Sequence, residues 1–158
     1  MRKLKINIKD IQLIVYDFDG VMTDNRVLVF QNEKEAVFCN RSDGLAISKI
    51  KKKKIPQIII STEKNKVVKA RAKKLRIPVL QSENDKEKLL KRYCQKKKIS
   101  LNKVIYIGND INDLEVMKIV GYPVAPCDAS KEIKCIAKII TKKKGGEGVV
   151  RELLEYIE

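Results

Sequence analysis

The stretch that decides the fold is Ile11-Gln-Leu-Ile-Val-Tyr-Asp-Phe-Asp-Gly-Val-Met-Thr-Asp24. Its apolar run, residues 13–16, predicts a buried strand. Two carboxylates one residue apart, Asp17 and Asp19, follow this run, and residues i and i+2 of an extended strand point the same way. Gly20 then allows the chain to turn. Because two like charges are costly to bury together without a cation or a shared proton, the pattern indicates a catalytic site here.

Apolar segments and amphipathic segments alternate along the rest of the chain. This alternation predicts an α/β fold in which a central parallel sheet lies between helices. Ligands should bind at the carboxyl ends of its strands. We expect strands at 11–17, 56–61, 78–80, 103–107, 121–125 and 137–140. We expect helices at 43–53, 64–75, 83–97, 111–119, 129–135 and 147–157.

One segment interrupts this alternation. Residues 26–39 contain two short apolar runs separated by Gln31-Asn-Glu-Lys34, which predicts a β-hairpin inserted after the first strand. Its exposed apolar residues need a cover, and a partner subunit is one such cover. These residues are Val27, Val29, Val37 and Phe38.

Polar residues follow three predicted strands and open one predicted helix. They form four groups, Asp17-Phe-Asp19, Ser61-Thr62, Asn84-Asp-Lys86 and Gly108-Asn-Asp110-Ile-Asn-Asp113. Each group alone is more typical of a turn, a helix cap or a solvated lysine. Together, at the same edge of one sheet, they favour a single site.

The four groups match the needs of phosphate-ester cleavage. A phosphomonoester is a dianion, so Mg²⁺ held by carboxylates must screen it from an anionic nucleophile. One aspartate attacks phosphorus, and a second carboxylic acid protonates the leaving oxygen and then deprotonates the hydrolytic water. A hydroxyl and a lysine bind the transferring oxygens.

Length and composition limit the other function classes. The 158 residues fit one domain, 1–158, and the chain has neither an apolar run long enough for a membrane span nor the apolar segment of a signal peptide. We therefore expect a cytoplasmic protein without a membrane partner. The chain lacks histidine and has no CxxC pair, so a zinc site is not expected, and the four cysteines should be reduced thiols.

The net charge of +15 raises the question of nucleic acid as a partner. Most of the excess lies in three lysine runs, 51–54, 96–98 and 142–144, and two of these fall at predicted helix ends, where cations are favourable. Arginine is sparse, and no aromatic residues interleave with the lysines to stack on bases. We expect no nucleic-acid partner, although the charge can attract anionic substrates.

The Asp17-Phe-Asp-Gly-Val-Met-Thr-Asp24 motif resembles the signature of the haloacid dehalogenase (HAD) superfamily of phosphatases, and the resemblance extends over essentially the whole chain. It implies a three-layer Rossmann-like HAD fold with a small β-hairpin in place of a cap domain. The small size and the tail Lys144-Gly-Gly-Glu-Gly-Val-Val-Arg-Glu152 resemble the 3-deoxy-D-manno-octulosonate 8-phosphate phosphatase group.

Two further motifs, Asn40-Arg-Ser-Asp-Gly-Leu-Ala-Ile47 and Ser61-Thr-Glu-Lys-Asn65, are most similar to the nine-carbon branch of that group. This branch includes ketodeoxynononate and N-acylneuraminate 9-phosphate phosphatases, and phosphatase-like domains fused to acylneuraminate cytidylyltransferases. Octulosonate phosphatases usually carry Thr-Gly-Arg where this chain has Ser61-Thr62-Glu63. The resemblance therefore favours a nine-carbon substrate.

The resemblance also implies residue roles. Asp17 is the expected nucleophile and Asp19 the general acid and base, with Mg²⁺ bound by the Asp17 side chain and the Asp19 backbone carbonyl. Ser61 and Lys86 match the phosphate-binding hydroxyl and lysine. The expected substrate-binding residues are Thr62, Glu63, Arg71 and Arg41, and Glu63 and Arg71, eight residues apart, would share one helix face.

The fourth group departs from the family pattern, which has aspartate directly after the glycine. This chain has Asn109 there, followed by Asp110. Either the Asn109 amide oxygen or the Asp110 carboxylate is the expected third metal ligand, with Asp113 supporting from behind. A neutral ligand would weaken Mg²⁺ binding.

Members of the resembled family form tetramers through their hairpins, and a neighbour's C-terminal tail can cover the active site. We therefore expect a homotetramer and a flexible arm at Gly145-Gly-Glu-Gly148, ahead of the last helix, within a tail of about 144–158. The alternatives are a simple loop for this tail, octulosonate 8-phosphate as substrate, phosphotransfer in place of hydrolysis, and a catalytically weak module that tetramerises a cytidylyltransferase.

Overall fold

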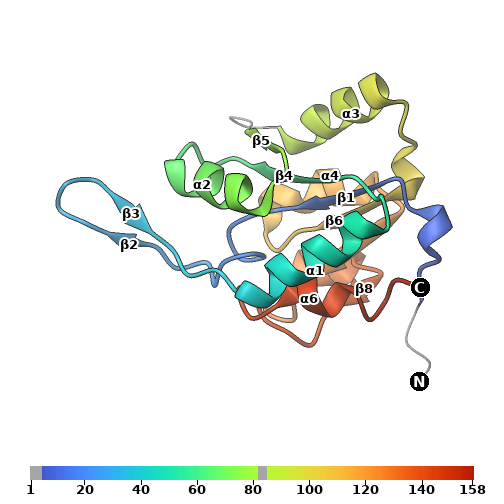
Figure 1. Ribbon diagram of the computed structural model, residues 1–158. Coiled ribbons are helices and arrows are strands. Elements are labelled where there is room, and N and C mark those ends of the chain that lie inside the picture. Colours follow the sequence, from blue (N-terminus) through green and yellow to red (C-terminus); the bar gives the residue numbers. More distant parts are fainter. Residues whose placement is uncertain (1–4, 82–84) are drawn as a thin grey trace.

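The computed structural model describes residues 5–81 and 85–158 (Figure 1). Six parallel strands form one sheet in the order β5-β4-β1-β6-β7-β8. Three layers, with helices on both faces of this sheet, confirm the expected α/β fold. The strands are β1 (Leu13–Tyr16), β4 (Gln57–Ser61), β5 (Val79–Gln81), β6 (Val104–Ile107), β7 (Tyr122–Ala125) and β8 (Ile139–Ile140).

Two hydrophobic cores lie on opposite faces of the sheet. Ile14 and Tyr16 of β1 face one core, and Leu13 and Val15 face the other. Strands buried on both faces are apolar without interruption, which explains the unbroken run 13–16. The first core holds α1 (Arg41–Lys52), α2 (Lys66–Leu75) and α6 (Val149–Leu153), and the second holds α3 (Lys86–Lys97), α4 (Leu114–Lys118) and α5 (Lys131–Ile136).

The register of the central strands sets the position of the site. Tyr16, the last residue of β1, pairs with Ile59 of β4 and Ile107 of β6. Polar residues that follow these three strands are therefore brought to one edge of the sheet. The expected helix at 111–119 is in part a 3-10 turn, η3 (Ile111–Asp113), that leads into α4; the other two single turns are η1 (Ile8–Asp10) and η2 (Leu101–Lys103).

The last predicted helix, 147–157, is wrong in length, because α6 ends at Leu153. The chain leaves the helix to pair with the N-terminal segment through an isolated bridge between Ile6 and Ile157. The N–H of Ile6 donates to the carbonyl of Tyr156 at 2.7 Å, and Tyr156 and Ile157 are buried. Burial of Tyr156 and Ile157, together with backbone pairing to the segment around Ile6, is therefore more favourable here than continuation of the helix.

The expected hairpin is present as β2 (Leu28–Val29) and β3 (Glu35–Ala36), which project from the body (Figure 1). Within the described residues it is the only insertion between β1 and α1. Val27, Val29 and Phe38 are exposed as expected, but Val37 is half-buried against the first core. Leu28 and Phe30 are exposed as well. No helix among the described residues is long and apolar enough to cross a membrane.

Asp43 joins α1 to α6 inside the first core. Its Oδ1 accepts the backbone N–H of Arg151 at 2.9 Å, whereas its Oδ2 is buried without a hydrogen-bond partner among the described residues. Burial raises the pKa of Asp43 to about 6, and the Arg151 N–H and the Arg71 guanidinium oppose this shift only in part. The folded state therefore keeps a proton that the unfolded state loses near pH 4.

Stability should fall with rising pH in this window. Between about pH 4 and pH 6 the folded state binds more protons at Asp43 than the unfolded state does, so the free energy of unfolding decreases as pH rises. Asp43→Asn removes this titration. We expect the free energy of unfolding of Asp43→Asn, minus that of wild type, to rise between about pH 4 and pH 6 and to stay constant above pH 6. Urea unfolding at a series of pH values measures this difference. Exposed Asp10→Asn is the control, and parallel wild-type and Asp43→Asn curves would contradict the assignment.

Candidate active site

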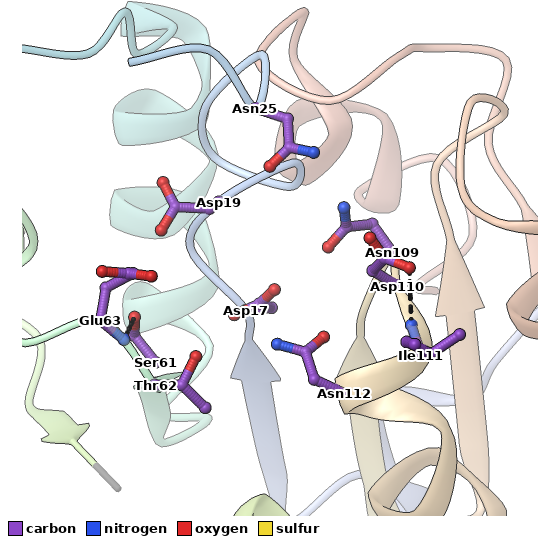
Figure 2. Close-up of a pocket in the computed structure, with 10 residues that line it drawn as sticks. All are labelled: Asp17, Asp19, Asn25, Ser61, Thr62, Glu63, Asn109, Asp110, Ile111 and Asn112. Atoms are coloured by element: carbon purple, nitrogen blue, oxygen red, sulfur yellow. Dashed lines mark hydrogen bonds between the residues drawn. The ribbon is translucent and has the colours of Figure 1, made fainter. Parts of the chain in front are cut away.

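A cleft of about 210 Å³ opens at the carboxyl edge of the sheet (Figure 2). Three of the four predicted groups contribute to its lining. Lys86, from the third predicted group, does not line the cleft but donates a hydrogen bond to Asp17, which does. Asn84, from the same group, lies outside the described residues. The lining residues are Asp17, Asp19, Asn25, Ser61, Thr62, Glu63, Asn109, Asp110, Ile111 and Asn112.

Asp17 and Asp19 lie in the turn that follows β1 and not in the strand itself. The carbonyl of Phe18 accepts the N–H groups of Met22 and Thr23 at 2.9 and 3.2 Å, which closes the turn. Gly20 has a φ of +77°, a conformation that glycine adopts without strain. Both carboxylates line the cleft even though the alternation of an extended strand does not place them there.

Thr23 orients the carboxylate of Asp19. Its Oγ1 accepts the backbone N–H groups of Gly20 and Asn25, each at 3.2 Å. The hydroxyl proton is therefore left for Asp19 Oδ1, 3.4 Å away. Burial, and then the charge of Glu63, raise the pKa of Asp19. A carboxyl group with a raised pKa suits a general acid.

Lys86 is a buried cation between two buried carboxylates. It is the first residue of α3, and its Nζ lies 2.7 Å from Asp17 Oδ1 and 2.7 Å from Asp113 Oδ1. Burial disfavours the charged ammonium, but the two carboxylates outweigh burial and raise the pKa of Lys86. Burial and the charge of Asp113 raise the pKa of Asp17 in turn, against the opposing effect of Lys86.

Asp113 is held by three donors and does not face the cleft. Its Oδ1 accepts the Tyr106 hydroxyl at 2.8 Å as well as Lys86, and its Oδ2 accepts the Asn109 N–H at 3.0 Å. A Cβ at position 108 would lie 2.7 Å from this carboxylate, which explains Gly108. Asp113 therefore positions Lys86 and the loop that carries Asn109. Tyr106 was not predicted, and its only sequence signal is a hydroxyl within a buried strand.

Three oxygen atoms converge beside Asp17. With the Asn109 amide oriented as in Figure 2, its Oδ1 lies 3.1 Å from Asp17 Oδ2 and 2.9 Å from the Asp19 carbonyl oxygen. None of these atoms has a proton to share, so they repel unless a cation lies between them or the amide rotates to donate. Neighbouring oxygens around an octahedral Mg²⁺ are about 3 Å apart. With the amide turned the other way, its nitrogen donates to Asp17 Oδ2 and to the Asp19 carbonyl at the same distances, which satisfies the site without a metal. With its oxygen turned toward them, the donor set and its spacing fit Mg²⁺.

Asp110 is less well placed for this role. It lines the cleft, but its Oδ1 accepts the N–H of Ile111 at 2.8 Å and caps the turn η3. Of the two candidate ligands, Asn109 and Asp110, the structure places the Asn109 amide beside Asp17 Oδ2 and the Asp19 carbonyl oxygen.

The comparisons with known proteins agree with this geometry. The family model of haloacid dehalogenase-like hydrolases matches residues 4–153. The chain is a haloacid dehalogenase-like hydrolase. The 3-deoxy-D-manno-octulosonate 8-phosphate phosphatase of Escherichia coli K12 is 32% identical over 150 residues, which cover 94% of this chain and 80% of the relative.

Two solved structures are similar along most of their length. A HAD family hydrolase from Streptomyces avermitilis has 41% identity and a TM-score of 0.94, and the match covers 97% of this chain and 88% of that chain. The Moraxella catarrhalis 3-deoxy-D-manno-octulosonate 8-phosphate phosphatase, solved with magnesium, phosphate and the octulosonate, has 30% identity and a TM-score of 0.89, with coverages of 93% and 85%. These relatives confirm the expected family, a phosphoric monoester hydrolase, and Mg²⁺ as cofactor.

The remaining predicted residues of the hydrolase fall into two places. Ser61 ends β4, and its Oγ accepts the N–H of Glu63 at 3.1 Å, so both lie with Thr62 at the cleft. Glu63 is in the loop before α2, whose N-cap is Asn65, so the expectation that Glu63 and Arg71 share a helix face is wrong.

Arg71 and Arg41 lie outside the cleft. Both line a separate groove between α1 and α2, and Arg71 donates from Nη2 to the carbonyl of Asn40 at 2.9 Å. Within one chain of the hydrolase, the structure therefore does not bring these two arginines to the cleft that Asp17 lines. Helix packing sets this direction, and helical spacing alone does not reveal it.

A second cleft adjoins the first beside Asp19 and Glu63. It has a volume of about 230 Å³ and is also lined by Asn25, Glu35 and Asn65. The Nδ2 of Asn65 donates to Glu35 at 3.0 Å, so the hairpin and the start of α2 meet here. The sequence did not single out Asn25 or Glu35, because the hairpin places them here only after folding.

Asn109→Asp should tighten Mg²⁺ binding. The substitution adds a negative charge at the atom that completes the three oxygens, and the charge of the ligand set is a main determinant of affinity for a hard cation. We expect the Mg²⁺ concentration for half-maximal activity to fall by roughly tenfold. Asp110→Asn is the matched control and should leave it unchanged. If Asp110→Asn weakens Mg²⁺ and Asn109→Asp has no effect, Asp110 is the ligand.

Proposed function

We propose that this hydrolase removes phosphate from 3-deoxy-D-manno-octulosonate 8-phosphate or a closely similar sugar-acid phosphate, through an aspartyl-phosphate on Asp17. The observation that supports this proposal is that the two carboxylate oxygens of Asp17 have different neighbours. Its Oδ1 contacts the Lys86 ammonium, and its Oδ2 belongs to the three oxygens that fit Mg²⁺. The octulosonate phosphatases among the relatives support the substrate class.

The reaction begins at Asp17 Oδ1, the oxygen that also accepts a hydrogen bond from Lys86. With Oδ2 facing the metal position, Oδ1 is the atom that attacks phosphorus, and the Asp17–phosphate bond forms as the phosphorus–leaving-oxygen bond breaks. Lys86, already 2.7 Å from Oδ1, is placed to bind an oxygen of the transferring group. Ser61 lines the same cleft and supplies a hydroxyl donor. When bound, Mg²⁺ neutralises charge and orients the phosphate.

Asp19 transfers the protons in both half-reactions. Its raised pKa favours the protonated acid, which gives its proton to the departing sugar hydroxyl. The resulting carboxylate then removes a proton from water, which attacks the aspartyl-phosphate and restores Asp17. The hydrogen bond from Thr23 keeps Asp19 Oδ1 in one orientation through both steps.

The second cleft is the expected place for the sugar. Its polar side chains are amides, carboxylates and the guanidinium of Arg26, all of which form hydrogen bonds with a polyhydroxylated chain, and Val27 and Val37 complete the lining. Glu63 lines both clefts, and this position supports a second candidate substrate, a nine-carbon sugar-acid 9-phosphate. The Ser61-Thr62-Glu63 motif of this chain is typical of phosphatases that act on such substrates. The intact group of Asp17, Asp19 and Lys86 argues against the weak tetramerising module, because a scaffold does not need these costly buried charges.

A substrate panel tests the function. With Mg²⁺, we expect release of phosphate from octulosonate 8-phosphate to exceed that from the 9-phosphates of ketodeoxynononate and N-acetylneuraminate. Asp17→Asn should reduce turnover by at least about 10³-fold, because it removes the nucleophile. Preference for a 9-phosphate would favour the second candidate, and near-wild-type turnover of Asp17→Asn would exclude the nucleophile assignment.

We also propose that the exposed hairpin packs against hairpins of other copies in a homotetramer. Its exposed apolar side chains, Val27, Leu28, Val29, Phe30 and Phe38, are 49–75% accessible in the single chain, which is costly for an unpaired two-stranded ribbon.

Adding charge to the hairpin should disrupt this assembly. Val29→Lys introduces a like charge on each copy at the centre of the ribbon, so we expect a smaller mass by light scattering. Ile111→Lys, an exposed apolar residue outside the hairpin, is the control and should leave the mass unchanged. A monomeric wild type, or an unchanged mass for Val29→Lys, would contradict the proposal.

A further inference from the structure

The tail of the chain lies against the catalytic turn. The segment 145–148, expected to be a flexible arm, is instead hydrogen-bonded to its own chain. Gly145 donates its N–H to Asp128 Oδ1 at 3.0 Å, and Gly146 donates its N–H to the Val21 carbonyl at 3.1 Å. Val21 belongs to the turn that carries Asp19 and Gly20.

The contact between the two segments has no spare room. A Cβ at position 145 would lie 2.2 Å from the Gly20 carbonyl oxygen, and one at position 146 would lie 2.5 Å from the Asp24 nitrogen. Real Cβ atoms do not approach backbone this closely, so a side chain at either position displaces the turn or the tail. Gly146 also has a φ of +73°. The glycines are therefore needed for backbone-to-backbone packing on the catalytic turn.

The other side of the turn is equally filled. A Cβ on Gly20 would lie 2.0 Å from Asn109 Nδ2, so the Asn109 side chain lies directly against Gly20. The peptide between Asp19 and Gly20 holds the carbonyl oxygen that meets Asn109 Oδ1. The turn thus lies between Asn109 and Gly145. A displacement of the turn away from Gly145 would therefore bring it closer to Asn109.

The rest of the tail fixes Gly145 in place. The buried carboxylate of Glu152 in α6 accepts the N–H groups of Lys142 and Lys143 at 2.9 Å, three and two residues before Gly145. Helix α6 packs on α1 in the first core. A rigid segment therefore extends from the core to the back of the catalytic turn.

We propose that Gly145 is a positioning residue for the metal site: its backbone packs on the Gly20 carbonyl, in the peptide that follows Asp19–Gly20, and so holds the turn in which the Asp19 carbonyl meets Asp17 and Asn109 at Mg²⁺ spacing. Groups behind a metal ligand affect affinity because they fix its orientation. This inference rests on the proposed function only in assuming that Mg²⁺ binds at the three oxygens.

Thermal unfolding at increasing Mg²⁺ concentrations tests the proposal without substrate, because a ligand of the folded state raises the melting temperature according to its dissociation constant. We expect Gly145→Ala to raise the Mg²⁺ dissociation constant by roughly tenfold to a hundredfold. Gly121→Ala is the matched control. Its Cβ would also meet a backbone carbonyl, Asn102 O at 1.8 Å, but in the connection before β7. It should lower the melting temperature while leaving the Mg²⁺ dissociation constant unchanged.

A second variant covers the case in which Gly145→Ala does not fold. Asp128→Ala removes the acceptor of the Gly145 N–H without adding bulk, and should raise the Mg²⁺ dissociation constant by roughly threefold to tenfold. A wild-type dissociation constant in Gly145→Ala, or in Asp128→Ala if that is the variant that folds, overturns the inference. A wild type that Mg²⁺ does not stabilise overturns the metal proposal as well, so the two failures are distinguishable.

Discussion

The structure depends on a balance of buried charge around Lys86. This ammonium is almost fully enclosed and contacts Asp17 and Asp113 at 2.7 Å each. Two ionised carboxylates and one ammonium leave one uncompensated negative charge, and Asp19, whose pKa is raised by burial, adds another only when it is ionised. Removing a single partner from such a buried group typically costs about 3–5 kcal/mol. A divalent cation at the three oxygens would offset this excess negative charge.

Every element around this cluster serves to hold one of its members. Asp17 directly follows strand β1, Gly108 directly follows β6 and leaves room for Asp113, and α3 begins at Lys86 itself. Tyr106 and the Asn109 N–H satisfy the remaining lone pairs of Asp113. The parallel register of β1 with β4 and β6 brings these residues together from positions far apart in sequence.

The sequence predicted the sheet and the centre of the site because both depend on local patterns. Unbroken apolar runs mark strands buried on both faces, and Asp17, Ser61 and Asn109 follow such runs directly. Side-chain direction across helices was not predictable in the same way. Arg71 turns toward Asn40 and a separate groove, and Glu63 precedes the helix on which it was expected.

The C-terminal segment shows the same limit most clearly. A glycine-rich stretch is typical of a flexible arm, yet Gly145 and Gly146 are required by close packing on the catalytic turn. Likewise, the final helix ends at Leu153 because Ile6 and Ile8 in the N-terminal segment form backbone hydrogen bonds with residues that follow this helix. Such contacts join residues more than a hundred positions apart, so composition and periodicity carry no signal for them.

A crystal structure of the protein grown with Mg²⁺ would show directly which residues hold the ion. We expect one ion in contact with Asp17 Oδ2, the Asp19 carbonyl oxygen and Asn109 Oδ1, with Lys86 still bridging Asp17 and Asp113. An ion held by Asp110, with the Asn109 amide nitrogen turned toward Asp17, would contradict this expectation.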